Sequence, residues 1–293
     1  MPYIYLSLSV LGMSSANILC GFFNKKNATA KKATVFYNLM FQIAALVAWA
    51  VLFCIEPSFD WGVVLYSLGF GTCFLTCNIG IVIAMKTGPV SLTSLIVQLS
   101  LIATTVWGFF FWNTPFTWYV GVGLALVVVS LWLSLYEGKK KNANEKLSLK
   151  WIVFVFLAFA GNAGCSIIQR TQQLSYNGQH GNLLMVCGLT IAVAFFLIQF
   201  LCLKKEEKAE IKPIFKKDWY LPVAGGLSNG LLNLMIILLA STTLSPSVIY
   251  PVLSVAGLAI VSIFSFLVFK EKMRWWQWLG VAVGAAAVAI LSL

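Results

Sequence analysis

Amide and thiol side chains recur at helical spacing inside long apolar stretches of this sequence. Within a lipid bilayer such a side chain needs a hydrogen-bonding partner or a water-filled cavity. Residues spaced by three or four share one face of a helix, so a run of them forms a polar stripe. Two stripes have this spacing: Asn17, Cys20 and Asn24 near the N-terminus, and Asn162, Cys165 and Gln169 in the second half. For this pair of stripes we favour a substrate cavity, in which the two faces meet and bind a polar ligand by hydrogen bonds.

Five further residues are candidates for the same binding site. Tyr250 directly precedes Pro251, and a proline inside a helix frees a backbone carbonyl, which either kinks the helix or opens a polar wall. The amides could instead hold helices together, a contribution of about 1 kcal/mol each. The candidates that complete the predicted substrate site are Asn78, Gln98, Asn229, Asn233 and Tyr250.

The residue types needed for catalysis or for metal binding do not cluster. The only histidine is His180, and none of the 7 cysteines has zinc-like spacing with it. We therefore expect no metal, no cofactor, no disulfide framework and no enzymatic activity. No Asp or Glu falls inside an apolar stretch, which predicts the absence of proton coupling through a carboxylate. Lys86 and Arg170 lie near stretch ends, where their side chains are expected to reach the interface; a role in holding a substrate carboxylate is the alternative.

The composition predicts that lipid is the solvent for most of the chain. Hydrophobic residues make up 60% and charged residues 10%, against about 25% charged residues in a soluble domain. The apolar stretches are long enough for helices that cross a hydrocarbon core of about 30 Å. Ten such spans are expected: 3–24, 33–55, 62–85, 90–112, 118–136, 151–170, 183–203, 220–241, 247–269 and 275–293.

The basic residues support this division of the chain. All but one of the 20 Lys and Arg residues lie after the first, third, fifth, seventh and ninth spans, and Arg170 is the exception. Cytoplasmic loops carry such an excess, so both termini are predicted to be extracytoplasmic. The alternation also explains the net charge of +11 as membrane topology, and we expect no nucleic-acid partner.

Local matches relate the two halves of the chain. Asn17 and Cys20 match Asn162 and Cys165 at an offset of 145 residues. Further matches pair Gly71 and Asn78 with Gly226 and Asn233 at an offset of 155, and Gly121 with Gly280 at an offset of 159. Five spans is an odd number, so the second half would be inverted in the membrane, as in many transporters. The predicted organisation is a first five-helix repeat at 1–136, a cytoplasmic linker at 137–150 and a second repeat at 151–293.

A longer motif near the C-terminus resembles a known family. The stretch from Tyr250-Pro251 through Lys270-Glu271, followed by Trp278-Leu279-Gly280, resembles the ten-helix EamA-like members of the drug/metabolite transporter superfamily. Glu271 matches the glutamate of the family's turn, whereas Lys270 replaces its usual glycine. The resemblance implies a basket of ten helices around a central cavity, lined mainly by the first, third, fourth, sixth, eighth and ninth helices.

The expected protein is thus an all-α integral membrane protein, multi-pass in the plasma membrane, as a monomer or homodimer. Two inverted-topology five-helix repeats would surround a central cavity. The expected function is alternating-access transport of a small neutral or zwitterionic metabolite, such as an amino acid or nucleoside. An exchanger of anionic metabolites such as nucleotide sugars is the alternative and requires Lys86 or Arg170 to point inward. An integral membrane enzyme and a non-transporting interaction protein are the remaining alternatives.

Overall fold

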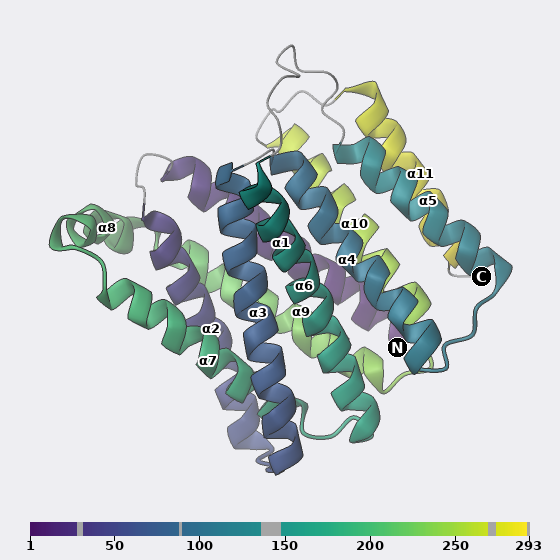
Figure 1. The fold of residues 1–293 in the computed structure, drawn as a ribbon, viewed down its shortest axis with the longest axis horizontal. Coiled ribbons are helices and arrows are strands. Elements are labelled where there is room, and N and C mark those ends of the chain that lie inside the picture. The colour runs from purple at the N-terminus through teal and green to yellow at the C-terminus, as the bar shows by residue number, and fades with distance from the viewer. Residues whose placement is uncertain (28–31, 88–89, 136–147, 269–273, 292–293) are drawn as a thin grey trace. The chain divides into compact units, whose positions relative to one another are not determined.

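The computed structural model is all-α in the part of the chain that it describes, which is residues 1–293 without 28–31, 88–89, 136–147, 269–273 and 292–293 (Figure 1). Most of the predicted linker 137–150 and the turn residues Lys270 and Glu271 lie outside the described residues, as does the side chain of Lys86. The helices are α1 (Pro2–Lys26), α2 (Ala33–Ile55), α3 (Trp61–Thr87), α4 (Val90–Phe111), α5 (Trp118–Leu135), α6 (Leu149–Ser175), α7 (Gly181–Leu201), α8 (Lys205–Asp218), α9 (Tyr220–Ala240), α10 (Pro246–Leu267) and α11 (Trp275–Leu291).

Ten of these helices coincide with the ten predicted spans. Seven of them (α1, α2, α3, α6, α7, α9 and α10) are long and apolar enough to cross a membrane by length and composition. Three shorter apolar helices, Ile96–Phe111, Trp118–Leu133 and Trp275–Leu291, fall within the remaining predicted spans. Large apolar side chains such as Val51, Leu65 and Phe156 are exposed along these helices, as lipid-facing surfaces require. The chain is a multi-pass membrane protein.

The helix α8 was not expected from the sequence, because its charged residues indicated a loop after the seventh span. Its apolar residues Ile211 and Ile214 are three apart and both are buried, so the segment is amphipathic rather than irregular. They pack in a cluster with Phe23, Phe36 and Leu221, at the end of α1 and the starts of α2 and α9. The helical spacing of Ile211 and Ile214 was present in the sequence, but the segment is short and rich in lysine, so it does not form a long apolar stretch.

The described residues form two compact units, each of which takes helices from both sequence halves. Unit 1 comprises Met1–Thr72 and Gln172–Thr242, and unit 2 comprises Cys73–Thr171 and Thr243–Leu293. The helices α3 and α6 each contribute one part to each unit.

Unit 1 is held together where backbones approach each other at glycines. The helix α1 packs along α9, and α2 packs along both α7 and α9. A Cβ added at Gly12 of α1 would lie 2.8 Å from the Ser228 carbonyl oxygen of α9. One added at Gly226 of α9 would lie 2.2 Å from the Phe41 carbonyl oxygen of α2. Only glycine permits these helix crossings, because any side chain would push the helices apart.

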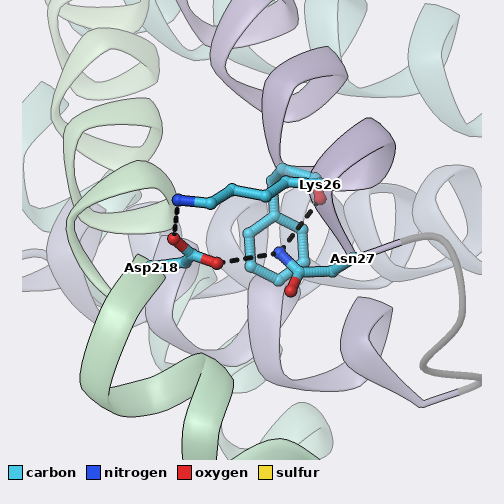
Figure 2. A network of polar contacts seen from close by, with 4 residues as sticks. Lys26, Asn27 and Asp218 are labelled. Carbon is cyan, nitrogen blue, oxygen red and sulfur yellow. Dashed lines mark hydrogen bonds and ion pairs between the residues drawn. The ribbon is translucent and has the colours of Figure 1, made fainter.

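One end of unit 1 carries an ion pair between an exposed lysine and a buried carboxylate, which fixes α8 to α1 (Figure 2). Asp218, the last residue of α8, is 2% exposed and accepts hydrogen bonds from the Lys26 ammonium group and, at 3.3 Å, from the Asn27 amide. The hydrogen bond to Asp218 raises the pKa of Lys26. A second pair, Lys32 with Glu207, joins the same two regions at 3.6 Å. The loop after α1 therefore meets the segment after α7.

The opposite end of unit 1 is built around the carboxylate of Asp60. This carboxylate accepts a hydrogen bond from the Tyr176 hydroxyl at 2.9 Å and from the backbone N–H of Gly62 at 2.7 Å, which caps the start of α3. The bond from Tyr176 lowers the pKa of Asp60 and helps to keep it ionised. Near the start of α7, the Asn182 amide donates to the Leu52 carbonyl near the end of α2 at 3.3 Å. At this end the loop after α2 meets the loop after α6.

Unit 2 contains two closely packed pairs of helices. The helices α5 and α11 lie side by side (Figure 1), and α10 packs against α4 and α11. The Ser130 hydroxyl of α5 donates to the Gly280 carbonyl of α11 at 2.7 Å, and a Cβ added at Gly284 would lie 2.6 Å from that hydroxyl. The small residues at 280 and 284 therefore pack α11 on α5 within one chain.

Two glycines of α9 provide a matched test of this packing. We expect Gly226→Ala to lower the melting temperature strongly, because its methyl group would overlap the Phe41 carbonyl. Gly230→Ala should leave the melting temperature unchanged or raise it, since its Cβ would meet no atom closer than 3.9 Å and alanine is favoured over glycine in a helix by about 1 kcal/mol. Thermal unfolding of both variants in the same detergent measures the difference, and equal melting temperatures would contradict the close crossing.

The ion pair at Asp218 predicts a rescue between two substitutions. Lys26→Met should lower the melting temperature, because it leaves a buried carboxylate without its cation. Adding Asp218→Asn should restore most of the loss, since the uncompensated charge is then gone. Lys212→Met, which removes an exposed lysine from α8, is the control and should have little effect. An additive loss in the double variant would argue against the pair.

Candidate functional site

A network of polar side chains lies inside unit 2, between α3, α4 and α6. The Asn162 amide of α6 donates to the Ser100 hydroxyl of α4 at 2.7 Å and to the Val97 carbonyl at 3.5 Å. Its side-chain oxygen accepts a hydrogen bond from the Cys77 thiol of α3 at 3.9 Å. Asn162 is thus the centre of the network, and its amide has partners on two neighbouring helices.

Two tryptophans hold α4 and α6 in register on either side of Asn162. The Trp151 indole N–H, at the start of α6, donates to the Thr93 hydroxyl near the start of α4 at 2.9 Å. The Trp112 indole N–H, just after α4, donates to the Thr171 hydroxyl near the end of α6 at 3.2 Å. The two helices therefore run parallel, and the polar residues between these bonds are fixed in position.

Tyr250 of α10 is buried next to the same face of α6. Its side chain is 2% exposed, and its hydroxyl donates to the Ser166 carbonyl at 3.4 Å. The rings of Tyr250 and Trp112 are 6.4 Å apart. One turn further along α10, the Ser254 hydroxyl donates to the Gln98 carbonyl of α4 at 3.2 Å. The helix α10 thus presents an aromatic and hydroxyl-bearing face to α4 and α6.

Arg170 is the least expected member of this group. We expected its side chain to reach the interface, but Arg170 is only 9% exposed. Its Nε has no hydrogen-bond partner, and in the part of the chain that the structure describes no carboxylate pairs with it. Tyr250 is close enough for an electrostatic interaction with it. The neighbouring Gln169 is 3% exposed, and its side-chain nitrogen also lacks a partner.

The predicted residues of unit 1 do not share one network. Asn17 is exposed on α1. Cys20, on the same stripe, accepts a bond from the Asn24 amide at 3.5 Å. On α9 the Asn233 amide donates to the Asn229 carbonyl oxygens, to the backbone at 2.9 Å and to the side chain at 3.1 Å.

The structure therefore divides the ten predicted site residues between the units. Six of them lie in unit 2: Asn78, Gln98, Asn162, Cys165, Gln169 and Tyr250. The other four, Asn17, Cys20, Asn229 and Asn233, lie in unit 1. Sequence reasoning missed the partners Ser100 and Ser166, because one serine in an apolar helix has no distinctive pattern. Among the described residues, no three His, Cys, Asp or Glu side chains could hold a metal ion together.

Comparison with known proteins shows the fold alone. No protein-family model and no curated protein matches the sequence. Among solved structures, 28 chains match. One of them, a crystal structure described only as that of a protein, covers 99% of this chain and 95% of its own, with a TM-score of 0.72 at 11% sequence identity. The arrangement of helices along nearly the whole chain thus occurs in a solved protein.

The bond between Asn162 and Ser100 predicts an energetic coupling. In a double-mutant cycle, Asn162→Ala and Ser100→Ala should couple by about 0.6 kcal/mol, the average for hydrogen bonds between membrane helices, and by no more than about 1.7 kcal/mol. Asn78→Ala replaces Asn162→Ala in the control cycle and should not couple to Ser100→Ala, because the Asn78 amide bonds to the Phe74 carbonyl of its own helix. Denaturant unfolding in mixed micelles measures both cycles, and equal coupling would refute the assignment.

Proposed function

We propose that this protein is a membrane transporter of a small polar metabolite that works by alternating access. The observation that carries the proposal is the polar face in unit 2, where Asn162, Gln169, Arg170 and Tyr250 lie within membrane-crossing helices. In lipid such groups are costly unless they bind one another, water or a ligand, and among the described residues the Nε of Arg170 and the side-chain nitrogen of Gln169 have no hydrogen-bond partner. Asn17 adds an exposed amide midway along an apolar helix, where a water-filled space would satisfy it.

Matching helix contacts in the two units support an inverted repeat of five helices. A Cβ added at Gly161 of α6 would lie 2.6 Å from the backbone nitrogen of Cys77 on α3. One added at Gly12 of α1 would lie 3.0 Å from the backbone nitrogen of Leu232 on α9. Leu232 follows Cys77 by 155 residues, which is the offset already proposed for these two helices. The contact between α1 and α9 thus has a counterpart between α6 and α3.

A second pair of contacts is related by the same offset of 155 residues. A Cβ at Gly71 of α3 would lie 3.0 Å from the Gly188 carbonyl oxygen of α7, and one at Gly226 of α9 would lie 2.2 Å from the Phe41 carbonyl oxygen of α2. Gly226 again follows Gly71 by 155 residues. Inverted repeats allow the two halves of a transporter to exchange conformations, so these contacts favour a transport mechanism.

The same contacts revise how α1 aligns with α6. They pair Gly12 with Gly161, an offset of 149, where the side-chain matches had suggested 145. The difference is four residues, or about one helical turn, so the polar faces still correspond. Under the revised alignment Asn17 corresponds to Ser166 and Cys20 to Gln169.

The charges at the two ends of unit 1 support the orientation proposed from the sequence. Lysines of the loop after α1 and of the segment around α8 meet at one end, where Lys26 pairs with Asp218 and Lys32 with Glu207. The other end contains Asp60 and Tyr176. By the positive-inside rule the lysine-rich end is cytoplasmic and both termini are extracytoplasmic in the plasma membrane.

The resemblance of the C-terminal motif to EamA-like transporters agrees with this proposal. A neutral or zwitterionic metabolite such as an amino acid or nucleoside suits the amide, hydroxyl and aromatic groups of unit 2. One observation favours the second candidate, a carrier of anionic metabolites, because Arg170 is buried rather than at the interface.

Asn17 provides the test of transport. Radiolabelled amino acids, nucleosides and sugars would be screened for uptake into proteoliposomes, and we expect one class to enter. Asn17→Ala should lower the uptake of that class about tenfold, the loss expected for about 1.4 kcal/mol of binding or barrier energy. Ser7→Ala is the control, since it removes another exposed polar group from α1, and should keep the uptake. Both variants should melt like the parent protein. Normal uptake by Asn17→Ala would contradict the assignment.

A further inference from the structure

Arg170 poses an electrostatic problem that the described structure does not solve internally. A guanidinium group is always charged in proteins and carries five N–H donors. Arg170 is 9% exposed and lies five residues before the end of the membrane-crossing segment Leu149–Ser175. Buried cations are normally paired with an anion, because removing an ion from water costs several kcal/mol. No such anion accompanies Arg170 among the described residues.

The groups that the structure describes around Arg170 in unit 2 are neutral. Gln169 precedes it on α6 with an unpartnered, buried side-chain nitrogen. The Tyr250 side chain is within electrostatic range, and the Trp112 ring lies next to Tyr250. These neutral groups balance none of the guanidinium charge, and the unpartnered nitrogen of Gln169 is a donor that an anionic ligand can use.

We propose that Arg170 is the anchor for the carboxylate of the transported metabolite, with the side-chain nitrogen of Gln169 as a neutral donor beside it. This inference rests on the proposed transport function and names its substrate class, a small metabolite with one carboxylate. The guanidinium forms two parallel N–H···O bonds to a carboxylate, a geometry that fixes both the position and the orientation of the ligand.

The charge of the site favours a carboxylate over a phosphate ester or a nucleotide. One guanidinium balances one negative charge, whereas a phosphate monoester carries nearly two and would leave the excess buried. In the described part of unit 2, no other buried cation accompanies Arg170. A zwitterion also suits the site, because the Tyr250 and Trp112 rings can face an ammonium group. An amino acid or a simple monocarboxylate therefore fits better than a nucleotide sugar.

Ligand-induced thermal shifts test this assignment on the purified protein. The probes are the proteinogenic amino acids, simple monocarboxylates, the amides of both sets, phosphate esters and nucleosides. We expect a stabilising shift from at least one carboxylate and none from its amide. Arg170→Gln should weaken that ligand about 10- to 100-fold, as the loss of a charge-assisted pair does. Arg170→Lys should have an intermediate effect, because lysine keeps the positive charge but cannot form the two parallel hydrogen bonds of a guanidinium group. The exposed Arg274→Gln is the control and should bind normally.

The melting temperature of the protein without ligand distinguishes a ligand anchor from a purely structural role of Arg170. If Arg170 only stabilised the fold, Arg170→Gln would lower the melting temperature without ligand. An anchor that is unpaired without ligand predicts an unchanged or higher melting temperature, since the uncompensated charge is removed. A lower melting temperature, or an equal ligand shift in the parent and Arg170→Gln, would overturn the proposal.

The two proposals fail in different ways. Stabilisation by phosphate esters or nucleosides alone, followed by their uptake into proteoliposomes, would overturn the carboxylate anchor and leave transport intact. Binding of a carboxylate that depends on Arg170, without any flux of that carboxylate in proteoliposomes, would support the anchor and overturn transport.

Discussion

The close approach of helix backbones at glycine is the contact on which the rest of this structure depends. Where Gly12, Gly161 and Gly226 lie against a neighbouring backbone, no side chain fits between the helices. Each crossing fixes the rotation of its helix and thereby decides which side chains point away from the contact. On α6, Gly161 lies against α3, while its neighbour Asn162 reaches α4. The polar face of unit 2 follows from this rotation, because lipid supplies no hydrophobic force that would orient a helix that is apolar on every side.

The helices were largely predictable and their partners were not. Long apolar stretches predicted ten of the eleven helices in the described part of the chain, since a segment in lipid must satisfy its backbone internally. The exception was α8, whose lysines hid the spacing of Ile211 and Ile214. Partner choice depends on how helices lie in space, and nothing in the sequence indicates that Ser100 would receive the amide of Asn162. The proposed repeat illustrates the same limit, because similar side chains suggest an offset of 145 residues between α1 and α6, whereas the crossing glycines suggest 149.

The sequence indicated the surroundings of the charged loop residues better than those of the charged residue inside a span. The alternation of lysines predicted which loops belong together, and the pair of Lys26 with Asp218 joins two loops of the predicted basic set. Arg170 was expected to follow the same rule because it lies near the end of its segment. Its burial depends on what surrounds the end of α6, including Tyr250 of α10, which is 80 residues away in sequence. A residue's distance from a helix end therefore predicts the depth of its backbone better than the environment of its charge.

The proposed carboxylate site at Arg170 also has a consequence for how the proposed transport cycle would respond to voltage. A monocarboxylate bound there would cancel its charge, so the empty protein would carry one more positive charge at that depth than the loaded one. A charge that moves through the whole membrane potential changes its energy by about 2.3 kcal/mol per 100 mV. Any conformational change that displaces α6 would therefore be sensitive to the potential in the empty state and nearly insensitive in the loaded state. An electrical gradient would then act on the return step of the cycle rather than on the step that carries the metabolite.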